Sequence, residues 1–564
     1  MTDKELIARA TAWMATDPDP QTRAATAAMI DQPKTLREHF GSRLAFGTAG
    51  MRGAIGPGPN RMNRALVHRV TDGLATHILA TLGRSGPVII GYDGRHGSKI
   101  FASDAARVLA GRGLDVLLYD RVAPTPEVAH ALIDLDGLAA VVVTASHNPP
   151  QDNGYKVFWR NGAQIVPPTD AEIASAIPED FPALGSGDGS ISAVPPAAQE
   201  RYLDAVDRLR VHRSTGARIV YSAMHGVGRD LVKTTLERAG HTDLHIVPEQ
   251  ADPHPDFPTV TFPNPEEPGA LELSYALADT VHADVILAND PDADRLAVAV
   301  RHQGQWRKLT GNQTGLLLAE DLLKHGQAER PMVATTIVST SMLQRVGKAH
   351  GATVIETLTG FKWIANAAIA WDADGGSFVT GFEEALGYSI GPVVRDKDGI
   401  SAALVVADLA SWCKERGATL IDALTDLYRV HGVAITSQRS AVLAGASGAT
   451  RIAAIMAALR DQALTEIGGL KVARIRDMAS GTAHDLATGA TSTIALPKSN
   501  VLAWDLQDGS RILARPSGTE PKIKFYFEVR APMGADESLD AAEARAGRKL
   551  AALEDAFMKL TSIS

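Results

Sequence analysis

Residues 88–118, VIIGYDGRHGSKIFASDAARVLAGRGLDVLL, combine an apolar run, a glycine-rich turn, a helical pattern and a second apolar run. This order is typical of a right-handed strand–helix–strand crossover in a parallel sheet. The same plan returns at residues 219–247 and again at residues 333–355. Because these stretches are separated by domain-sized intervals, we expect three similar α/β domains rather than a short-period repeat.

The rest of the chain follows other patterns. The first forty or so residues are rich in alanine and charge and predict short helices, and residues 180–198 predict a surface loop near a domain edge. Lys522 to Val529 alternates like a half-buried strand, and residues 537–560 form an amphipathic helical pattern. A chain of 564 residues is too long for one core. We therefore expect three or four domains, with a closing α+β domain.

Composition narrows the class of protein. The formal net charge is −9 and no basic block stands out, which argues against nucleic acid as a partner. No apolar run is long enough to span a bilayer, and the N-terminus lacks the pattern of a signal peptide. The single cysteine, Cys413, excludes an internal disulfide. We expect a cytoplasmic protein that does not bind membranes, in which any anionic ligand needs a locally positive pocket.

The strongest chemical segment is Thr144-Ala145-Ser146-His147-Asn148-Pro149, directly after the apolar residues 139–143. Ligands of open α/β sheets gather at loops beyond the carboxyl ends of strands. Ser146 is a candidate nucleophile, with His147 and Lys156 as candidate proton carriers. The alternative is a polar turn closed by proline, whereas a hydrolase elbow lacks its Gly-x-Ser-x-Gly pattern here.

A second segment, Asp290-Pro291-Asp292-Ala293-Asp294-Arg295, also follows an apolar run. Carboxylates at alternate positions of a tight loop can converge on a hard cation such as Mg²⁺. An acidic surface turn is the alternative, although three packed carboxylates repel one another without a cation. A calcium EF-hand is excluded, because its glycine and glutamate positions hold Arg295 and Arg301.

Three further segments are weaker on their own. Residues 515–522, RPSGTEPK, combine cations, hydroxyls and a glycine, as a phosphate-binding loop does. Residues 46–53, FGTAGMRG, permit close backbone approach beside a cation. Residues 381–388, GFEEALGY, offer carboxylates for sugar hydroxyls. A solvated turn is the alternative for the first of these, and a helix N-terminus for the last.

Taken together, these five segments resemble the α-D-phosphohexomutase superfamily in type and order, over residues 40 to 530. Finer features, at residues 151–157, 264–267, 358–362 and 396–399, are similar to the branch with phosphoglucomutases, phosphopentomutases and glucose 1,6-bisphosphate synthase. The resemblance implies four domains around a central cleft. We place domain 1 at residues 1–212, domain 2 at 213–328, domain 3 at 329–436 and domain 4 at 437–564.

The resemblance also implies roles for particular residues. It assigns catalysis to Ser146, His147, Lys156 and Arg52, the metal site to Ser146, Asp290, Asp292 and Asp294, and substrate binding to Arg295, Thr359, Gly360, Glu383, Lys397, Arg515, Ser517, Gly518, Thr519 and Lys522. One Mg²⁺ per active site and glucose 1,6-bisphosphate as activator or intermediate are implied as cofactors. The implied partners are small sugar phosphates, and we expect a monomer or weak homodimer.

The implied reaction interconverts glucose 1-phosphate and glucose 6-phosphate through phosphorylated Ser146. The alternatives are a phosphopentomutase, a phosphomannomutase or a glucose 1,6-bisphosphate synthase, and, from another class, a non-catalytic sugar-phosphate sensor. One departure bears on the sugar: many relatives have serine where this chain has Ala385. The missing hydroxyl removes one possible sugar contact, worth on the order of 1 kcal/mol.

Overall fold

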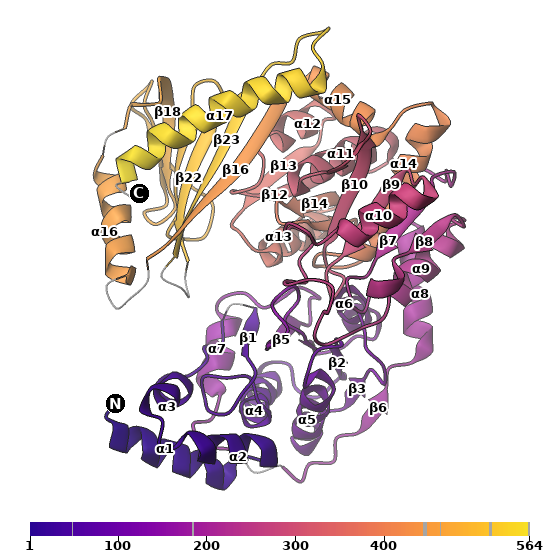
Figure 1. Cartoon of the computed structure of the whole chain (residues 1–564). Helices are drawn as coiled ribbons and strands as arrows, with labels where there is room; N and C mark the ends of the chain where they lie inside the picture. Colours follow the sequence, from indigo (N-terminus) through magenta and orange to yellow (C-terminus); the bar gives the residue numbers. More distant parts are fainter. Residues whose placement is uncertain (48, 183–184, 444–447, 463, 518–521, 562–564) are drawn as a thin grey trace.

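Four β-sheets follow one another along the chain, and each draws its strands from one continuous stretch of sequence (Figure 1). The computed structural model describes residues 1–47, 49–182, 185–443, 448–462, 464–517 and 522–561. Within these ranges, no helix has both the length and the apolar character that crossing a membrane would need. The architecture confirms three α/β domains followed by a C-terminal domain of a different type.

The first sheet has the strand order β1-β5-β4-β2-β3-β6. Its domain comprises β1 (Gly50–Ala54), α4 (Arg64–Thr81), β2 (Val88–Tyr92), α5 (Ser98–Gly111), β3 (Val116–Leu118), α6 (Thr125–Asp134), β4 (Ala139–Val143), β5 (Asp152–Trp159), α7 (Thr169–Ala176), β6 (Ile191–Ala193) and α8 (Pro196–Asp207). The unit expected at residues 88–118 is present as β2, α5 and β3, with parallel strands.

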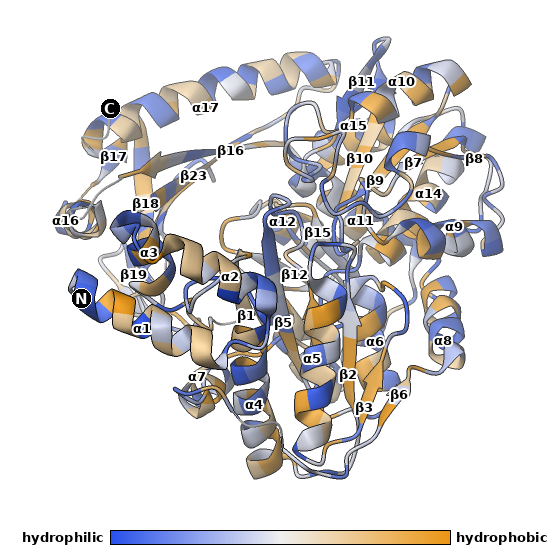
Figure 2. Cartoon of the chain, turned by 60° about the horizontal axis from the view of Figure 1, so that its bottom comes forward, coloured by the Kyte–Doolittle hydropathy of each residue, from blue (hydrophilic) through white to orange (hydrophobic). Residues whose placement is uncertain are grey.

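Strand β2 is buried on both of its faces. Val88 and Ile90 pack into the apolar cluster that contains α4 and α5, whereas Ile89 packs with Val128 of α6 on the opposite side. Figure 2 shows β2 and β3 in the hydrophobic colour beside α5 and α6. A continuous apolar run, rather than an alternating one, is what a parallel sheet between two helix layers needs.

The N-terminal helices are present as expected, at α1 (Asp3–Thr16), α2 (Pro20–Met29) and α3 (Pro33–Phe40). They bury a small core of their own that includes Leu6 and Phe40. The segment 180–198, expected as a surface loop, instead contributes β6 and the start of α8. β6 is an exposed edge strand of three residues, so it needs no apolar pattern and shows none.

The second sheet has the order β11-β10-β9-β7-β8. The elements here are β7 (Ile219–Ser222), α9 (Arg229–Arg238), β8 (Leu244–Ile246), a short 3₁₀ helix (Pro248–Gln250), α10 (Glu272–Val281), β9 (Val285–Asn289), β10 (Leu296–His302) and β11 (Gln305–Lys308). β7 pairs in parallel with β8 and β9, but β10 turns back antiparallel to β9. The acidic loop of residues 290–295 is this tight connection between β9 and β10.

The third sheet has the order β13-β12-β14-β15. Its elements are α11 (Gly311–His325), β12 (Pro331–Thr336), α12 (Leu343–Ala349), β13 (Thr353–Thr357), α13 (Phe361–Ala373), β14 (Ser377–Glu383), β15 (Gly387–Ile390), α14 (Gly399–Glu415) and α15 (Leu420–His431). The unit expected at residues 333–355 is confirmed as β12, α12 and β13. Gly315 of α11 lies against the ring of Phe382 in β14, where a side chain would not fit.

The fourth sheet is antiparallel along its main path, in the order β16-β23-β22-β21-β18-β19-β20. It consists of β16 (Val433–Val442), α16 (Gly448–Asp461), β17 (Glu466–Ile467), β18 (Leu470–Asp477), β19 (Thr482–Asp485), β20 (Thr491–Thr493), β21 (Leu502–Leu506), β22 (Arg511–Pro516), β23 (Lys522–Ala531) and α17 (Leu539–Thr561). Helix α17 lies across β16 and β23 (Figure 1), and its Phe557 packs edge-on against Phe525 and Phe527. The expected strand and closing helix are both confirmed.

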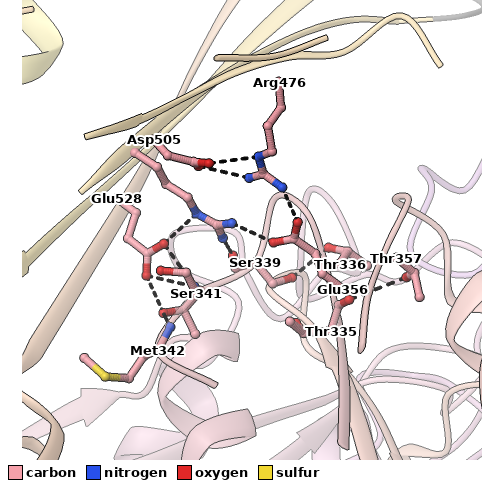
Figure 3. Close-up of polar contacts among 12 residues, drawn as sticks. Thr335, Thr336, Ser339, Ser341, Met342, Glu356, Thr357, Arg476, Asp505 and Glu528 are labelled. Carbon is pink, nitrogen blue, oxygen red and sulfur yellow. Dashed lines mark hydrogen bonds and ion pairs between the residues drawn. The ribbon is translucent and has the colours of Figure 1, made fainter. Parts of the chain in front are cut away.

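A network of ion pairs joins the third and fourth domains. Glu356 of β13 accepts hydrogen bonds from Arg476 of β18 and Arg511 of β22. Arg511 also donates to Glu528 at 2.7 Å, and Glu528 accepts from the Ser341 backbone N–H at 3.0 Å. Figure 3 shows Glu356 between the two domains, with Arg476 reaching it from the fourth. The fourth domain is therefore held to the third through paired, largely buried charges.

Candidate active site

Ser146 lies just beyond the carboxyl end of β4, in a loop whose backbone is held on several sides. Its φ of +52° falls in the left-handed region, where a non-glycine residue is strained. The Ser146 N–H donates to Thr144 Oγ1 at 2.9 Å, and the buried Arg95 donates to the carbonyl of Ser146 at 2.5 Å. Arg95 donates also to the carbonyls of Asn148 and Pro149. The loop therefore presents the serine hydroxyl in one orientation.

The acidic loop of the second domain meets this serine. Asp290, Asp292 and Asp294 are almost completely buried, and one oxygen from each lies within 4.8 Å of the others. Ala293, between the last two, also has a left-handed φ, +57°, which tightens the turn. The hydroxyl of Ser146 donates to Asp290 Oδ2 at 2.7 Å. Residues 144 apart in sequence thus form one cluster across two domains.

Two lysines neutralise part of this acidic cluster. Lys156 of β5 donates from Nζ to Asp292 Oδ2 at 2.6 Å and to Asp294 Oδ2 at 2.8 Å. Lys397 Nζ lies 3.3 Å from the same Asp294 oxygen. Burial alone would lower the pKa of Lys156, but the two aspartates raise it above its ordinary value. Lys156 is therefore a charged ammonium in this arrangement.

The remaining carboxylate oxygens fit a divalent cation. Asp292 Oδ1 and Asp294 Oδ1 are buried without a hydrogen-bond partner among the described groups. Burial and the charges of Asp292 and Asp294 raise the pKa of Asp290 well above its ordinary value. Converging, unsatisfied hard oxygens are the donor set that Mg²⁺ prefers. The aspartate trio can hold such an ion, and its charge would offset the repulsion within the trio.

His147 lies beside the serine, and the cations of Arg52 and Arg295 lie near His147. The His147 Nδ1 lies 3.2 Å from Ser146 Oγ. Burial, together with the charges of Arg295 and Arg52, lowers the pKa of His147 to about 2, so the ring is neutral. Arg52 lies on β1, opposite Gly154 of β5, and β1 was not expected as a strand because its glycine-rich sequence has no β pattern. The three side chains combine a neutral proton acceptor with two cations.

A cavity of about 820 Å³ opens beside this cluster and reaches the fourth domain. His147 and Arg295 line it from the first two domains, and Lys522 and Lys524 of β23 line it from the fourth. The cleft that the sequence predicted is therefore present, with cations on its far wall. This is the local positive charge that a protein of net charge −9 needs to bind an anion.

The predicted sugar loop ends at the cavity wall with two adjacent glutamates. Glu383, at the end of β14, accepts a hydrogen bond from the Gly360 N–H at 2.8 Å, and burial raises its pKa. The adjacent Glu384 lines the cavity instead, and its Oε2 accepts from Ser339 Oγ at 2.7 Å. Thr359 Oγ1 is buried without a hydrogen-bond partner among the described groups. The structure thus brings two adjacent carboxylates to this wall, and Glu384 is the one that borders the cavity.

The predicted phosphate loop is only partly described. Arg515 lies near the end of β22 and pairs in register with Lys524, and the Ser517 N–H donates to the carbonyl of Lys522 at 2.7 Å. Gly518 and Thr519, also predicted to bind substrate, lie outside the described residues. Arg515 and Ser517 are not among the residues that line the cavity, whereas Lys522 is.

Several residues at the site were not predicted from the sequence. Thr125, the first residue of α6, donates to Asp292 Oδ2 at 2.6 Å, and nothing local distinguishes it from an ordinary helix start. Arg95 was part of the quoted GYDGR turn, yet its contact with the serine loop could not be read from the sequence. Lys524 carried a usable signal, because it alternates with Lys522 on the same face of a predicted strand.

Sequence comparison bears directly on this site. Four family models match the chain, at residues 43–182, 200–304, 310–430 and 452–546. They describe the phosphoglucomutase/phosphomannomutase α/β/α domains I, II and III and the C-terminal domain of the same proteins. The chain belongs to the phosphoglucomutase/phosphomannomutase family. The resemblance drawn from the five motifs is confirmed.

Relatives of this phosphoglucomutase/phosphomannomutase family member carry different substrate names. It is 39% identical to a probable phosphomannomutase of Haemophilus influenzae, over 88% of this chain and 99% of the relative. It is 36% identical to a human phosphopentomutase, over 94% of this chain and 92% of the relative. Other relatives are named phosphoglucomutase in Staphylococcus aureus and glucose 1,6-bisphosphate synthase in mouse. The chain is thus an enzyme of the mutase class, and these names leave its sugar open.

Solved structures agree on the fold. A phosphoglucomutase/phosphomannomutase family protein of Burkholderia thailandensis superposes with a TM-score of 0.69 at 20% identity. The match covers 91% of this chain and 96% of the other. The four-domain arrangement is therefore that of the family.

Proposed function

We propose that this mutase interconverts glucose 1-phosphate and glucose 6-phosphate through a phosphoryl group carried on Ser146. The observation that carries the proposal is the 2.7 Å contact between Ser146 Oγ and Asp290 Oδ2. It places a buried hydroxyl against a carboxylate cluster that fits a divalent ion, as catalysed phosphoryl transfer requires. His147, the next residue, lines the cavity, so the serine loop borders the space available to a substrate.

Two transfers complete the proposed reaction. In the first, a sugar hydroxyl gives its proton to a base and attacks the phosphorus on Ser146. A new P–O bond forms, the bond to Ser146 Oγ breaks, and the leaving serine oxygen takes up a proton. The products are glucose 1,6-bisphosphate and free Ser146. The bisphosphate then turns end for end. In the second transfer, the Ser146 hydroxyl gives up its proton and attacks the other phosphorus. The bond from that phosphorus to the sugar oxygen breaks, the sugar oxygen takes up a proton, and a hexose monophosphate leaves phosphorylated Ser146 behind.

The proton acceptor that the geometry supports best is His147. Its Nδ1 lies 3.2 Å from Ser146 Oγ, within reach of a proton on the reacting oxygen, although burial lowers its pKa and makes it a weaker base than a free imidazole. Lys156, the other candidate, is protonated while Asp292 and Asp294 hold it. In this arrangement it orients the carboxylates and balances their charge, and it would accept a proton only after losing those contacts.

Charge at both ends of the cavity matches a substrate with two phosphate positions. Mg²⁺ held by Asp290, Asp292 and Asp294 would supply positive charge beside the phosphoryl oxygens of Ser146. Arg52 and Arg295 add fixed cations on the same side. Across the cavity, Lys522 and Lys524 can hold the non-reacting phosphate, and Arg515, Ser517, Gly518 and Thr519 are proposed to complete that cradle.

Glucose is the sugar we propose, and ribose is the second candidate. The cavity volume of about 820 Å³ is within the range of small-molecule sites and has room for a hexose bisphosphate. The carboxylates of Glu383 and Glu384 can accept hydrogen bonds from the hydroxyls of a sugar ring, which is the role proposed for this loop. A pentose is supported by the human phosphopentomutase, which aligns over 94% of this chain.

Turnover of competing substrates tests the sugar. The purified enzyme, with Mg²⁺ and catalytic glucose 1,6-bisphosphate, should have its highest kcat/KM on glucose 1-phosphate among glucose, mannose and ribose 1-phosphates. A higher value for ribose 1-phosphate would replace glucose with the second candidate. A bisphosphate synthase would instead form glucose 1,6-bisphosphate from glucose 1-phosphate and an acyl phosphate faster than it isomerises either hexose phosphate.

The covalent step has its own test. Incubation with glucose 1,6-bisphosphate should add one phosphoryl group to the intact protein, and peptide mapping should place it on Ser146. Ser146→Ala should abolish both labelling and turnover but keep sugar-phosphate binding, whereas the surface variant Ser175→Ala should behave as wild type. Undiminished turnover in Ser146→Ala would exclude the mechanism, and binding without turnover in the unmodified protein would favour a sensor.

A further inference from the structure

A second cluster of metal-ligating side chains lies far along the chain from the aspartate loop. It consists of His212, in the connection between α8 and β7, and of Asp321 and His325 near the end of α11. One nitrogen from each histidine and one oxygen from Asp321 lie within 4.8 Å of one another. The mechanism proposed above uses none of these groups.

The geometry of the cluster is close to that of a coordination sphere. The Nε2 atoms of His212 and His325 lie 2.8 Å and 3.8 Å from the same oxygen, Oδ1 of Asp321. Tetrahedral ligands at about 2.0–2.1 Å from a zinc ion lie about 3.3 Å from each other. That value falls midway between the two observed separations. Small opposite movements of the two rings would therefore admit an ion.

The surroundings of Asp321 indicate an incomplete set of partners. The side chain of Asp321 is 6% exposed. Its second oxygen, Oδ2, is buried without a hydrogen-bond partner among the described groups. A buried carboxylate normally has both oxygens satisfied; here Oδ1 faces the two histidines and Oδ2 has no such partner in the described part of the chain, so the charge of Asp321 is only partly balanced.

Trp412 of α14 packs against both imidazole rings. Its indole stacks on His212 with ring centroids 4.7 Å apart, and it packs against His325 at 5.1 Å. Rings held by packing lose little conformational entropy on binding an ion. His325 is also the last residue of α11, where the carboxyl end of the helix attracts positive charge.

We propose that His212, Asp321 and His325 form a second divalent-metal site, suited to Zn²⁺ rather than Mg²⁺. Two imidazoles and one carboxylate are the donors that zinc and similar transition metals favour, whereas Mg²⁺ favours oxygen alone. The side chain of His325 is 28% exposed, so water has access to a fourth position. The ion would join the connection before β7 to helix α11 and act as a structural clamp away from the chemistry.

Charge around the site sets the conditions for binding. Burial lowers the pKa of His325, Asp321 opposes that shift, and nearby His212, Lys324 and Arg416 reinforce it. A metal ion binds the neutral form of an imidazole. Lys324 and Arg416 also repel a cation, which weakens its binding.

Calorimetric titration of the full-length, chelator-treated protein with Zn²⁺ tests the site. Excess Mg²⁺ occupies the aspartate loop throughout the titration. We expect one equivalent of Zn²⁺ to bind, and His325→Ala to weaken this binding at least about tenfold. The matched control is His245→Ala, which removes a part-exposed histidine with a lone carboxylate partner, Asp243, at 2.8 Å. That variant should bind Zn²⁺ as the wild type does.

A second readout locates the ion. Ni²⁺ binding at the cluster should quench the emission of Trp412, so the metal-dependent change should be lost in Trp412→Phe. Mutase turnover in Mg²⁺ should be the same in His325→Ala and wild type. Zinc binding that survives His325→Ala but disappears in Asp292→Asn would overturn the proposal, because the ion would then occupy the catalytic loop. Absence of any zinc binding to the wild type would overturn it equally.

Discussion

The hydroxyl of Ser146 lies 2.7 Å from Oδ2 of Asp290, although 144 residues of sequence separate them. The contact joins a loop after β4 of the first sheet to a loop after β9 of the second. Each loop contains one residue with a left-handed backbone conformation, Ser146 in the first and Ala293 in the second. Such strain costs on the order of 1–3 kcal/mol per residue and persists only where surrounding contacts hold it. Here Arg95 and Thr144 provide those contacts.

Replacement of Arg95 should therefore impair catalysis without touching the substrate. Arg95→Met removes hydrogen bonds to three carbonyls of the serine loop, at Ser146, Asn148 and Pro149. A nucleophile displaced by about 1 Å loses roughly 100-fold in rate. We expect kcat to fall by about that factor while KM changes little. Unchanged kcat, measured alongside the exposed variant Arg107→Met, would show that the loop holds its shape without Arg95.

The aspartate trio should make activity depend on a divalent ion. Removal of Mg²⁺ with a chelator should abolish turnover, and Mg²⁺ should restore it. Asp292→Asn should raise the Mg²⁺ concentration needed for half-maximal activity by at least about 10- to 100-fold. Asp279→Asn, an exposed carboxylate in the same domain, is the control. Full activity in the presence of chelator would remove the metal from the mechanism.

The junction of the third and fourth domains should be a major source of stability. Arg511→Met leaves Glu528 and Glu356 each without one partner, and breaking such a buried pair costs about 3–5 kcal/mol. Arg474→Met, on β18, removes an exposed pair with Asp505 and should cost less than about 1 kcal/mol. Denaturant unfolding of the two variants, followed by the fluorescence of Trp504 in the fourth domain, measures the difference. Equal losses of unfolding free energy in the two variants would mean that the ion pairs at the junction contribute no more to stability than an exposed pair.

Lys362 should make the stability of the folded protein depend on pH in the alkaline range. Burial lowers its pKa to about 8, whereas an unfolded lysine titrates near pH 10.4. Between these values the unfolded chain binds more protons than the folded one, so stability rises with pH. The destabilisation caused by burying the charged Lys362 is fully present below about pH 8 and is relieved toward about pH 10. It amounts to roughly 3 kcal/mol, since each pKa unit is worth about 1.4 kcal/mol.

Comparison of the Tm of Lys362→Met with that of the wild type tests whether stability rises with pH. Methionine carries no charge, so the variant should have the higher Tm at about pH 7, and its advantage should shrink as the pH approaches about 10. The surface variant Lys233→Met provides the baseline for loss of a lysine charge. An advantage that grows with pH would show that the folded protein raises the pKa of Lys362 instead.

Much of the fold could be predicted because its signals are local. Buried parallel strands such as β2 and β9 are short apolar runs, and their helices repeat apolar residues at helical spacing. β1 and β6 were missed because one is rich in glycine and the other is an exposed edge strand. Neither buries enough apolar surface to leave a pattern in the sequence.

The sequence by itself determined which loops are candidates for chemistry, because a polar loop that follows a strand is a continuous segment with its own composition. Only the tertiary structure decided which loops meet. It set Ser146 against Asp290, brought Thr125 to Asp292, and placed Glu384 rather than Glu383 at the cavity wall. The physical reason is that such contacts depend on how whole domains pack. The partners in the first two contacts lie more than a hundred residues apart, so no local pattern of residues records them.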